Sequence, residues 1–200
     1  MTRGAFTFYF DLRCPFCFVA SERLRSSKDR PPPIEYRSVR HDRDLPVPAR
    51  EQTSSERAFV EKELVMLRER APETTLANPQ LWPSTAPVAR AVAAMARTGR
   101  GDVGAFVSAT YRAFWREGRD PSNALVLGAA LREAGAGGLV ASAEDDALLA
   151  SWGHDWAGME QRTPTFVSAT GVALVGLTTA RRLEAFLRSG RLGEESEDAC

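Results

Sequence analysis

The spacing of apolar residues predicts strands near both ends of this chain and helices between them. Residues 5–10 form a mostly apolar run that is typical of a buried strand, and residues 14–26 carry apolar side chains at helical spacing. Three consecutive prolines then precede residues 34–40, which we expect to form a second strand parallel to the first. The chain therefore begins with a βαβ unit, and a loop rich in proline and charge follows over residues 42–52.

From residue 54 to about residue 158 the pattern becomes helical, and no strand is predicted. Apolar positions bounded by capping or helix-breaking residues predict helices over residues 55–70, 85–97, 103–117, 122–134 and 143–158. After them we expect a β-hairpin over residues 165–168 and 171–176 and a last helix over residues 181–189. The pattern as a whole predicts an α/β fold with an inserted all-helical subdomain.

Composition narrows the classes of protein that fit this pattern. The chain has 200 residues, of which 44% are hydrophobic, and a formal net charge of zero. A chain of this length can bury a sizeable core, and its balanced charge gives no electrostatic basis for binding nucleic acid. Asp11 interrupts the first apolar run, which is too short for a secretory signal, and no segment is long enough to span a membrane. We therefore expect a cytoplasmic protein with no nucleic-acid or membrane partner.

A Cys-x-x-Cys motif, Cys14-Pro15-Phe16-Cys17, lies where the first predicted strand gives way to a helix. Two cysteines at this spacing can close a small, reversible disulfide, which makes the motif a candidate redox site. The first turn of a helix has unpaired N–H groups and the positive end of the helix dipole, and both stabilise a thiolate. We therefore predict Cys14 as the nucleophile and Cys17 as the resolving thiol. Pro15 suits the first helical position, and Pro15 and Phe16 complete the active-site loop.

Two other interpretations of these cysteines stay open, a structural metal site and a pair of inert buried thiols. A closed zinc site needs four ligands, and beyond the motif the chain offers only His41, His154 and Cys200, so we predict no metal. We interpret His41 as a loop residue and His154 as either a helix-surface residue or a satisfied buried residue, because neither lies in a catalytic motif. Cys200 ends an acidic tail, residues 191–200, that we expect to be mobile. Its thiol is either incidental or able to reach the active disulfide or to cross-link a homodimer.

A second landmark is Thr163-Pro164, directly before the strand predicted at residues 165–168. Proline is compatible with the first residue of a strand or with an edge strand. If the Thr163–Pro164 peptide bond is cis, the turn can hold a backbone edge against the disulfide and present it to an extended substrate. The alternative is an ordinary trans proline that opens a strand, and the sequence does not decide between the two.

The chain resembles the DsbA-like branch of the thioredoxin superfamily in two segments, FYFDLRCPFC at residues 8–17 and TPTFV at residues 163–167. The best match is the FrnE-type subgroup, which neighbours the hydroxychromene-carboxylate isomerases and the kappa-class glutathione transferases. The resemblance implies a thioredoxin fold split by the helical insertion, with Thr163 and a cis Pro164 facing the cysteines. Asp11 matches the Asp-x-x-Cys-Pro pattern of this family, and its carboxylate either orients the loop or caps the helix that follows.

The helical subdomain is expected to close a cleft over Cys14. Within this cleft we predict Trp82, Ser84 and Thr85 as substrate contacts, because aromatic and hydroxyl groups suit a flat organic ligand or a small thiol. The predicted units are a thioredoxin-fold N-terminal half (1–53), the inserted helical subdomain (54–160), a C-terminal half (161–190) and the tail (191–200).

The motifs favour a thiol-disulfide oxidoreductase in which Cys14 attacks a substrate disulfide and Cys17 releases the product. The alternative is a glutathione- or mycothiol-dependent enzyme that reduces or isomerises a small aromatic or polyketide-like molecule in the cleft. The isomerase relatives usually place serine where this chain has Cys14, so the intact cysteine pair favours the first hypothesis over isomerisation. A binding or chaperone module without turnover is the third hypothesis.

We expect no tightly bound cofactor and leave open whether glutathione or mycothiol serves as co-substrate. The predicted partner is a disulfide-containing substrate or a small-molecule thiol, and a homodimer stays open.

Overall fold

The structure is a computed structural model that describes residues 6–27, 31–39 and 45–192. The hypotheses on His41, on Cys200 and on residues 193–200 of the predicted tail lie outside the described residues. Each predicted helix and strand is confirmed, with bounds within a few residues of the prediction. Within the described ranges, no helix combines the length and the apolar character needed to cross a bilayer.

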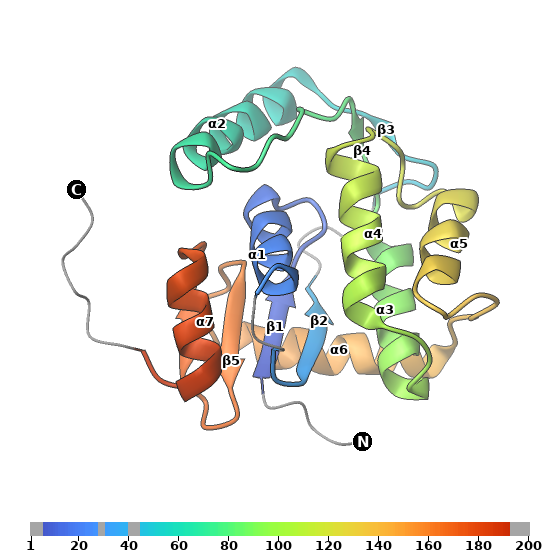
Figure 1. The fold of residues 1–200 in the computed structure, drawn as a ribbon. Coiled ribbons are helices and arrows are strands. Elements are labelled where there is room, and N and C mark those ends of the chain that lie inside the picture. The colour runs from blue at the N-terminus through green and yellow to red at the C-terminus, as the bar shows by residue number, and fades with distance from the viewer. Residues whose placement is uncertain (1–5, 28–30, 40–44, 193–200) are drawn as a thin grey trace.

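A four-stranded sheet with the strand order β2-β1-β5-β6 forms the centre of the fold (Figure 1). The strands are β1 (Phe6–Phe10), β2 (Ile34–Ser38), β5 (Thr165–Ser168) and β6 (Ala173–Val175). β1 pairs in parallel with β2 and antiparallel with β5, so the N-terminal βαβ unit and the C-terminal hairpin meet in one sheet. Phe8 lies opposite both Tyr36 and Phe166 in this register, and the Phe8 and Phe166 rings stack with their centroids 4.4 Å apart.

Helices cover both faces of the sheet. The helices of the described residues are α1 (Pro15–Arg25), α2 (Ser54–Arg70), α3 (Ala86–Thr98), α4 (Val103–Trp115), α5 (Ala124–Glu133), α6 (Ala143–Ala157) and α7 (Ala180–Ser189). Side chains alternate along β1, so Phe6 packs on one face against Phe186 of α7, with ring centroids 5.5 Å apart. Tyr9 points to the other face and stacks on Trp156 of α6 at 5.3 Å. Figure 1 accordingly shows α1 and α7 on one side of the sheet and α6 on the other.

The helical insertion differs from the prediction in one detail. It contains a very short strand that pairs with another very short strand in the segment before the insertion. β3 (Arg50–Glu51) lies in the segment predicted as a loop, and β4 (Leu81–Trp82) lies where no strand was predicted. The two pair antiparallel, with Arg50 opposite Trp82. Strands of two residues have no readable alternation, so hydrophobic periodicity could not have predicted them.

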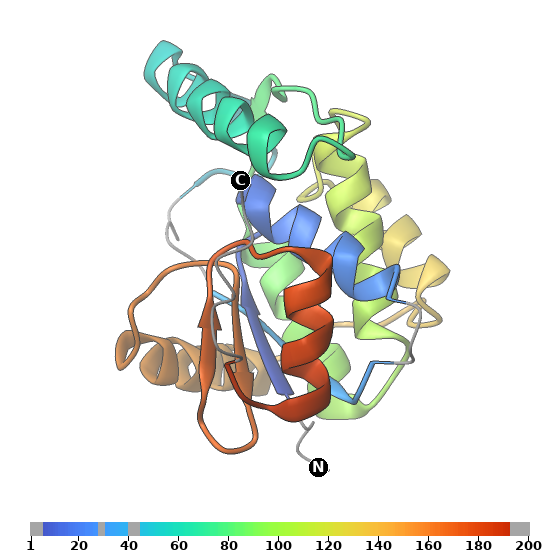
Figure 2. The same cartoon turned by 60° about the vertical axis from the view of Figure 1, so that its left-hand side comes forward.

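α2 lies apart from the sheet, beyond the end of α1 at which that helix begins (Figures 1 and 2). Its N-terminus is closed by a capping box in which Thr53 and Glu56 bond each other's backbone N–H groups. Val60, Leu64 and Leu67 are buried and fasten the helix to the body of the protein. α2 therefore forms a wall that stands over the first turn of α1.

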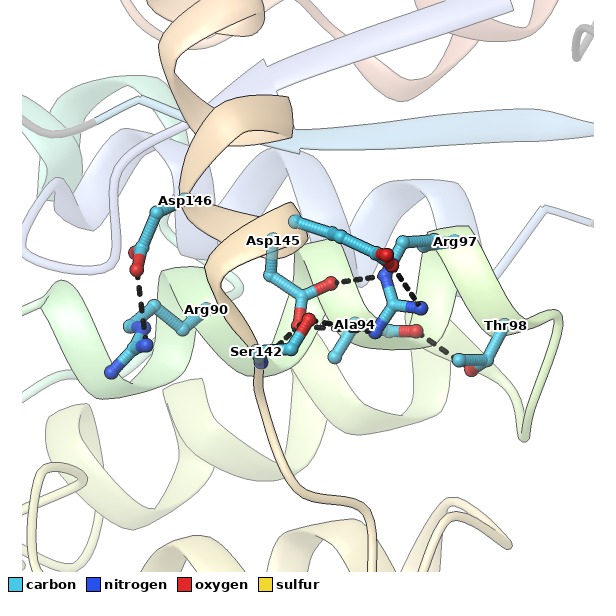
Figure 3. A network of polar contacts seen from close by, with 8 residues as sticks. Arg90, Ala94, Arg97, Thr98, Ser142, Asp145 and Asp146 are labelled. Carbon is cyan, nitrogen blue, oxygen red and sulfur yellow. Dashed lines mark hydrogen bonds and ion pairs between the residues drawn. The ribbon is translucent and has the colours of Figure 1, made fainter.

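An ion-pair network fastens the beginning of α6 to α3 (Figure 3). The Arg97 Nε donates to Asp145 Oδ1 at 2.7 Å, and the Ser142 N–H donates to Asp145 Oδ2 at 2.6 Å. Asp145 is fully buried, and the Arg97 guanidinium beside it holds the pKa of its carboxyl below the usual range. Arg90 and Asp146 add a second ion pair at 3.0 Å. Because α6 leads directly back to the segment before β5, this network helps to fix where the C-terminal half re-enters the sheet.

Candidate active site

Cys14 is the N-cap residue of α1, with an extended backbone at φ −87° and ψ 114°. Pro15 occupies the first helical turn, where its missing N–H costs no hydrogen bond. The Cys14 carbonyl accepts the N–H groups of Cys17 at 3.1 Å and of Phe18 at 3.3 Å, so both cysteines belong to one helical turn. Both thiols are free. Cys14 is partly exposed whereas Cys17 has no exposed surface, so only the first thiol is accessible from outside.

The segment at Thr163 and Pro164 lies directly against Cys14. The Thr163–Pro164 peptide bond is cis, and the Cys14 Sγ lies 3.8 Å from the Thr163 carbonyl oxygen. The Pro164 carbonyl accepts the Gly176 N–H at 2.8 Å, which ties this turn to the end of β6. The fold thus brings together two segments that are 149 residues apart in the sequence.

Two side chains of α4 hold the loop between β1 and Cys14. The Tyr111 hydroxyl donates to the Asp11 carbonyl at 2.9 Å, and the Trp115 Nε1 donates to the Leu12 carbonyl at 3.0 Å. The Asp11 carboxylate accepts the N–H of Arg13 at 2.9 Å, and α1 has no side-chain cap. Of the two roles considered for Asp11, this geometry fits orientation of the loop rather than capping of the helix. The contribution of α4 was not predicted from the sequence.

Burial sets the electrostatics behind Cys14. Loss of solvent raises the pKa of the Cys17 thiol well above its usual value, and the neighbouring Cys14 thiol raises it further. Burial also raises the pKa of the Tyr111 hydroxyl, which lies beside Cys17. Cys17 is therefore held as a protonated thiol in the reduced protein.

A cavity of about 550 Å³ opens above Cys14. The active-site loop, α2, β4 and the segments around Thr163 and Gly176 all contribute to its wall. The lining residues are Asp11, Arg13, Cys14, Phe16, Phe59, Glu63, Met66, Arg70, Trp82, Arg162, Thr163, Gly176 and Leu177. The cavity is thus bounded on one side by the active-site loop and the segments beside β5 and β6, and on the other by the insertion.

The structure places only one of the three predicted insertion residues in this cavity. Trp82 lines it, and the Arg13 guanidinium lies 4.7 Å from the centroid of its ring. Ser84 and Thr85 are each 1% exposed and do not line the cavity, which corrects the expectation that they contact substrate. The physical reason is that both precede α3 and face the interior, where the Ser84 hydroxyl accepts the Ala86 N–H. His154 lies exposed on α6, away from the cavity.

The sequence matches the family model of the DSBA-like thioredoxin domain over residues 6–149. The chain belongs to the DsbA-like thioredoxin family. Two solved structures share its fold. A probable DsbA oxidoreductase from Streptomyces coelicolor has a TM-score of 0.65 at 16% identity, covering 93% of this chain and 88% of that one. A candidate protein disulfide isomerase from Nitrosomonas europaea has a TM-score of 0.72 at 15% identity, covering 93% of this chain and 98% of that one. No curated protein matches the sequence.

In this DsbA-like domain, sequence reasoning missed the contribution of α2 to the site. Phe59, Glu63, Met66 and Arg70 follow each other at intervals of four, three and four residues and line the cavity together. Phe59 is 57% exposed and Met66 is 42% exposed, which is unusual for large apolar side chains. Two apolar residues outside the helical spacing of the buried stripe, Phe59 and Met66, were the signal that could have indicated this wall.

No group of three or more His, Cys, Asp or Glu side chains that could hold a metal ion occurs among the residues that the structure describes.

Proposed function

We propose that this DsbA-like protein is a thiol-disulfide oxidoreductase that cycles a disulfide between Cys14 and Cys17. The observation that carries this proposal is the difference in exposure between the two thiols. Cys14 lines a cavity that can admit a substrate, whereas Cys17 lies one helical turn behind it with no exposed surface. The accessible thiol suits the nucleophile, and the buried thiol suits the group that resolves a mixed disulfide.

The proposed reaction has two exchange steps. The Cys14 thiolate attacks one sulfur of the substrate disulfide, and the other substrate sulfur leaves as a thiolate. Cys17 then loses its proton and attacks Cys14 Sγ, which closes the Cys14–Cys17 disulfide and releases the second substrate sulfur. The two electrons of the two protein thiols thereby pass to the substrate, and the same steps in reverse oxidise a dithiol.

The surroundings of Cys14 support its role as the attacking group. Its position at the N-cap of α1 brings the sulfur close to the unpaired N–H groups and the positive dipole end of the first turn. The Thr163 carbonyl beside it belongs to a backbone segment along which an extended chain could lie. We infer that the partner is a disulfide-containing chain or a small disulfide.

A second candidate function is a glutathione- or mycothiol-dependent reaction on a small molecule. The observation in its favour is the cavity itself, since about 550 Å³ falls within the range of small-molecule sites, roughly 300 to 1,000 Å³. Phe16 and Trp82 both line the cavity and offer aromatic surface for a flat ligand. In this reaction the small thiol would form a mixed disulfide with Cys14 or bind beside it.

Redox equilibration tests both functions. The protein carrying Cys200→Ser, which leaves only two thiols, is equilibrated across defined thiol and disulfide buffers, alkylated and weighed. A single two-electron transition at Cys14 and Cys17 is the result expected of an oxidoreductase. Cys14→Ser should abolish exchange, and Cys17→Ser should accumulate the mixed disulfide. A stable adduct of Cys14 with the small thiol in the protein with both cysteines, without an internal disulfide, would instead support the second function.

A further inference from the structure

Glu63 is the acidic residue that α2 presents to the cavity. The helix carries two stripes, a buried one of Val60, Leu64 and Leu67 and a neighbouring one that lines the cavity together with Cys14. Glu63 lies in the middle of the second stripe, between Phe59 and Met66. Glu63 therefore belongs to the wall of the cavity that Cys14 also lines.

The surroundings of Glu63 differ from those of Glu56 and Glu61 on the same helix. Glu56 pairs with Arg50 at 2.6 Å, and Glu61 pairs with Arg68 at 3.3 Å. Within the described residues, the Glu63 carboxyl makes no hydrogen bond or ion pair, although it is only partly exposed. A cavity-lining carboxyl without a protein partner is available to a ligand.

The ionisation of Glu63 suits proton transfer near neutral pH. Burial, with a smaller effect from the charge of Asp11, raises its pKa to about 7. Both the acid and the carboxylate are therefore populated at neutral pH. The other ionisable side chains that line the cavity are Asp11, Arg13, Cys14, Arg70 and Arg162.

We propose that Glu63 is a catalytic acid and base that transfers a proton to and from the substrate sulfur during exchange at Cys14, an inference that rests on the proposed oxidoreductase function. When the Cys14 thiolate attacks, the bond between the two substrate sulfurs breaks. The leaving sulfur takes the electron pair of that bond and accepts the proton of the Glu63 carboxyl, which gives a neutral thiol and a carboxylate. Glu63 then regains a proton from solvent. In the opposite direction, the carboxylate accepts the proton of an incoming thiol as that thiol attacks a Cys14 disulfide.

This role makes a prediction about leaving groups. An alkyl thiol is a weaker acid than Glu63, as free cysteine with its pKa of about 8.5 illustrates, and gains from protonation as it leaves. A pyridine-thiol leaving group departs readily as an anion and gains little. The test therefore compares two uncharged disulfides, bis(hydroxyethyl) disulfide and dipyridyl disulfide. Because neither substrate is charged, a change in the charge of the cavity does not attract or repel either of them.

The experiment measures single-turnover rates for the reduced protein and for Glu63→Gln. Glu69→Gln is the matched control, because Glu69 lies on the same helix, is exposed and does not line the cavity. Glu63→Gln should slow exchange with the alkyl disulfide by about 100-fold, the lower end of what acid–base catalysis contributes, and leave the pyridyl rate within about threefold. Glu69→Gln should leave both rates unchanged. An equal loss with both substrates, or no loss with either, would overturn the proposal.

The pH dependence of the exchange rates gives a second measurement. A purely structural role of Glu63 would not change it. In the unsubstituted protein, the ratio of the alkyl rate to the pyridyl rate should fall as pH rises through about 7, because the Glu63 acid is lost. Ionisation of Cys14 affects both rates and cancels in this ratio. In Glu63→Gln the ratio should be constant with pH, and a ratio that still falls there refutes the assignment. Absence of Cys14-dependent exchange in the unsubstituted protein would refute the oxidoreductase function instead.

Discussion

Replacing Tyr111 with phenylalanine tests whether α4 stabilises the active-site loop. The substitution removes one hydroxyl and with it the 2.9 Å hydrogen bond to the Asp11 carbonyl, and the buried ring keeps its packing. The Asp11 carbonyl still accepts the Cys14 N–H at 3.2 Å, so no buried acceptor is left without a partner. The expected loss is that of one net hydrogen bond, about 1 kcal/mol. For a chain of this length this loss lowers the Tm by about 2 to 4 °C.

We expect Trp115→Phe to lower the free energy of unfolding by more than Tyr111→Phe does. The Leu12 carbonyl is buried and, within the described residues, accepts only the Trp115 Nε1–H. Removing that donor leaves the carbonyl without a partner, which costs about 1 to 3 kcal/mol in addition to the loss of side-chain volume. Trp152→Phe is the matched control, because Trp152 is 1% exposed as well and its indole makes no hydrogen bond in the described part of the chain.

Urea unfolding of the reduced protein, followed by tryptophan fluorescence and by circular dichroism, measures these free energies. The difference between Trp115→Phe and Trp152→Phe then isolates the hydrogen bond from the volume change. A loss above about 3 kcal/mol for Tyr111→Phe would show that the hydroxyl does more than bond one carbonyl. No loss for either α4 variant would refute the inference that this helix holds the loop.

Three further outcomes are expected. Iodoacetamide should label Cys14 in the folded, reduced protein and leave the buried Cys17 unlabelled, as read by peptide mass, and equal labelling would contradict the assigned order of the two thiols. Glu56→Gln should destabilise the protein by up to about 1 kcal/mol at neutral pH, because it removes the charge that pairs with Arg50. Since a neighbouring arginine and the helix cap lower the pKa of Glu56 to about 2, this difference between the two proteins should disappear as the pH falls from about 4.3 towards 2 in urea titrations. Gly104→Ala should cost about 1 to 3 kcal/mol, because an added Cβ would meet the Tyr36 hydroxyl at 2.7 Å, and an unchanged urea midpoint would show that this tyrosine can move aside.

The parts of the fold that sequence predicted well are those that local rules determine. The β1 run, the proline after Cys14 and the proline before β5 each act on the chain within a few residues. The rule that a strand, a helix and a second strand form a right-handed parallel unit then placed β2 beside β1. The pairing of β3 with β4 was not predicted, because a strand of two residues has no hydrophobic pattern. The whole of α2 also separates the two strands in the sequence.

The predicted contacts of Ser84 and Thr85 were wrong for a related reason. A hydroxyl before a helix is equally suited to a ligand and to the N–H groups of the helix start, and the sequence does not distinguish the two. The structure shows the second use, with the Ser84 hydroxyl accepting the Ala86 N–H. Trp82, two residues earlier, reaches the cavity because it belongs to β4 rather than to the beginning of α3.

The wall formed by α2 could not have been predicted from motifs, because its position depends on how the helix docks. Each residue advances about 100° around a helix, so the buried stripe at Val60 and Leu64 and the cavity stripe at Phe59 and Glu63 are one residue apart. A rotation of α2 by a single residue would bury the charge of Glu63 and expose the anchoring leucines, at a cost far above that of an exposed phenylalanine. The burial of the anchoring stripe therefore directs Glu63 towards the cavity that Cys14 also lines. The chemistry of Cys14 is encoded in the loop that contains it, whereas the acid that we propose to serve it is positioned by the core of the insertion.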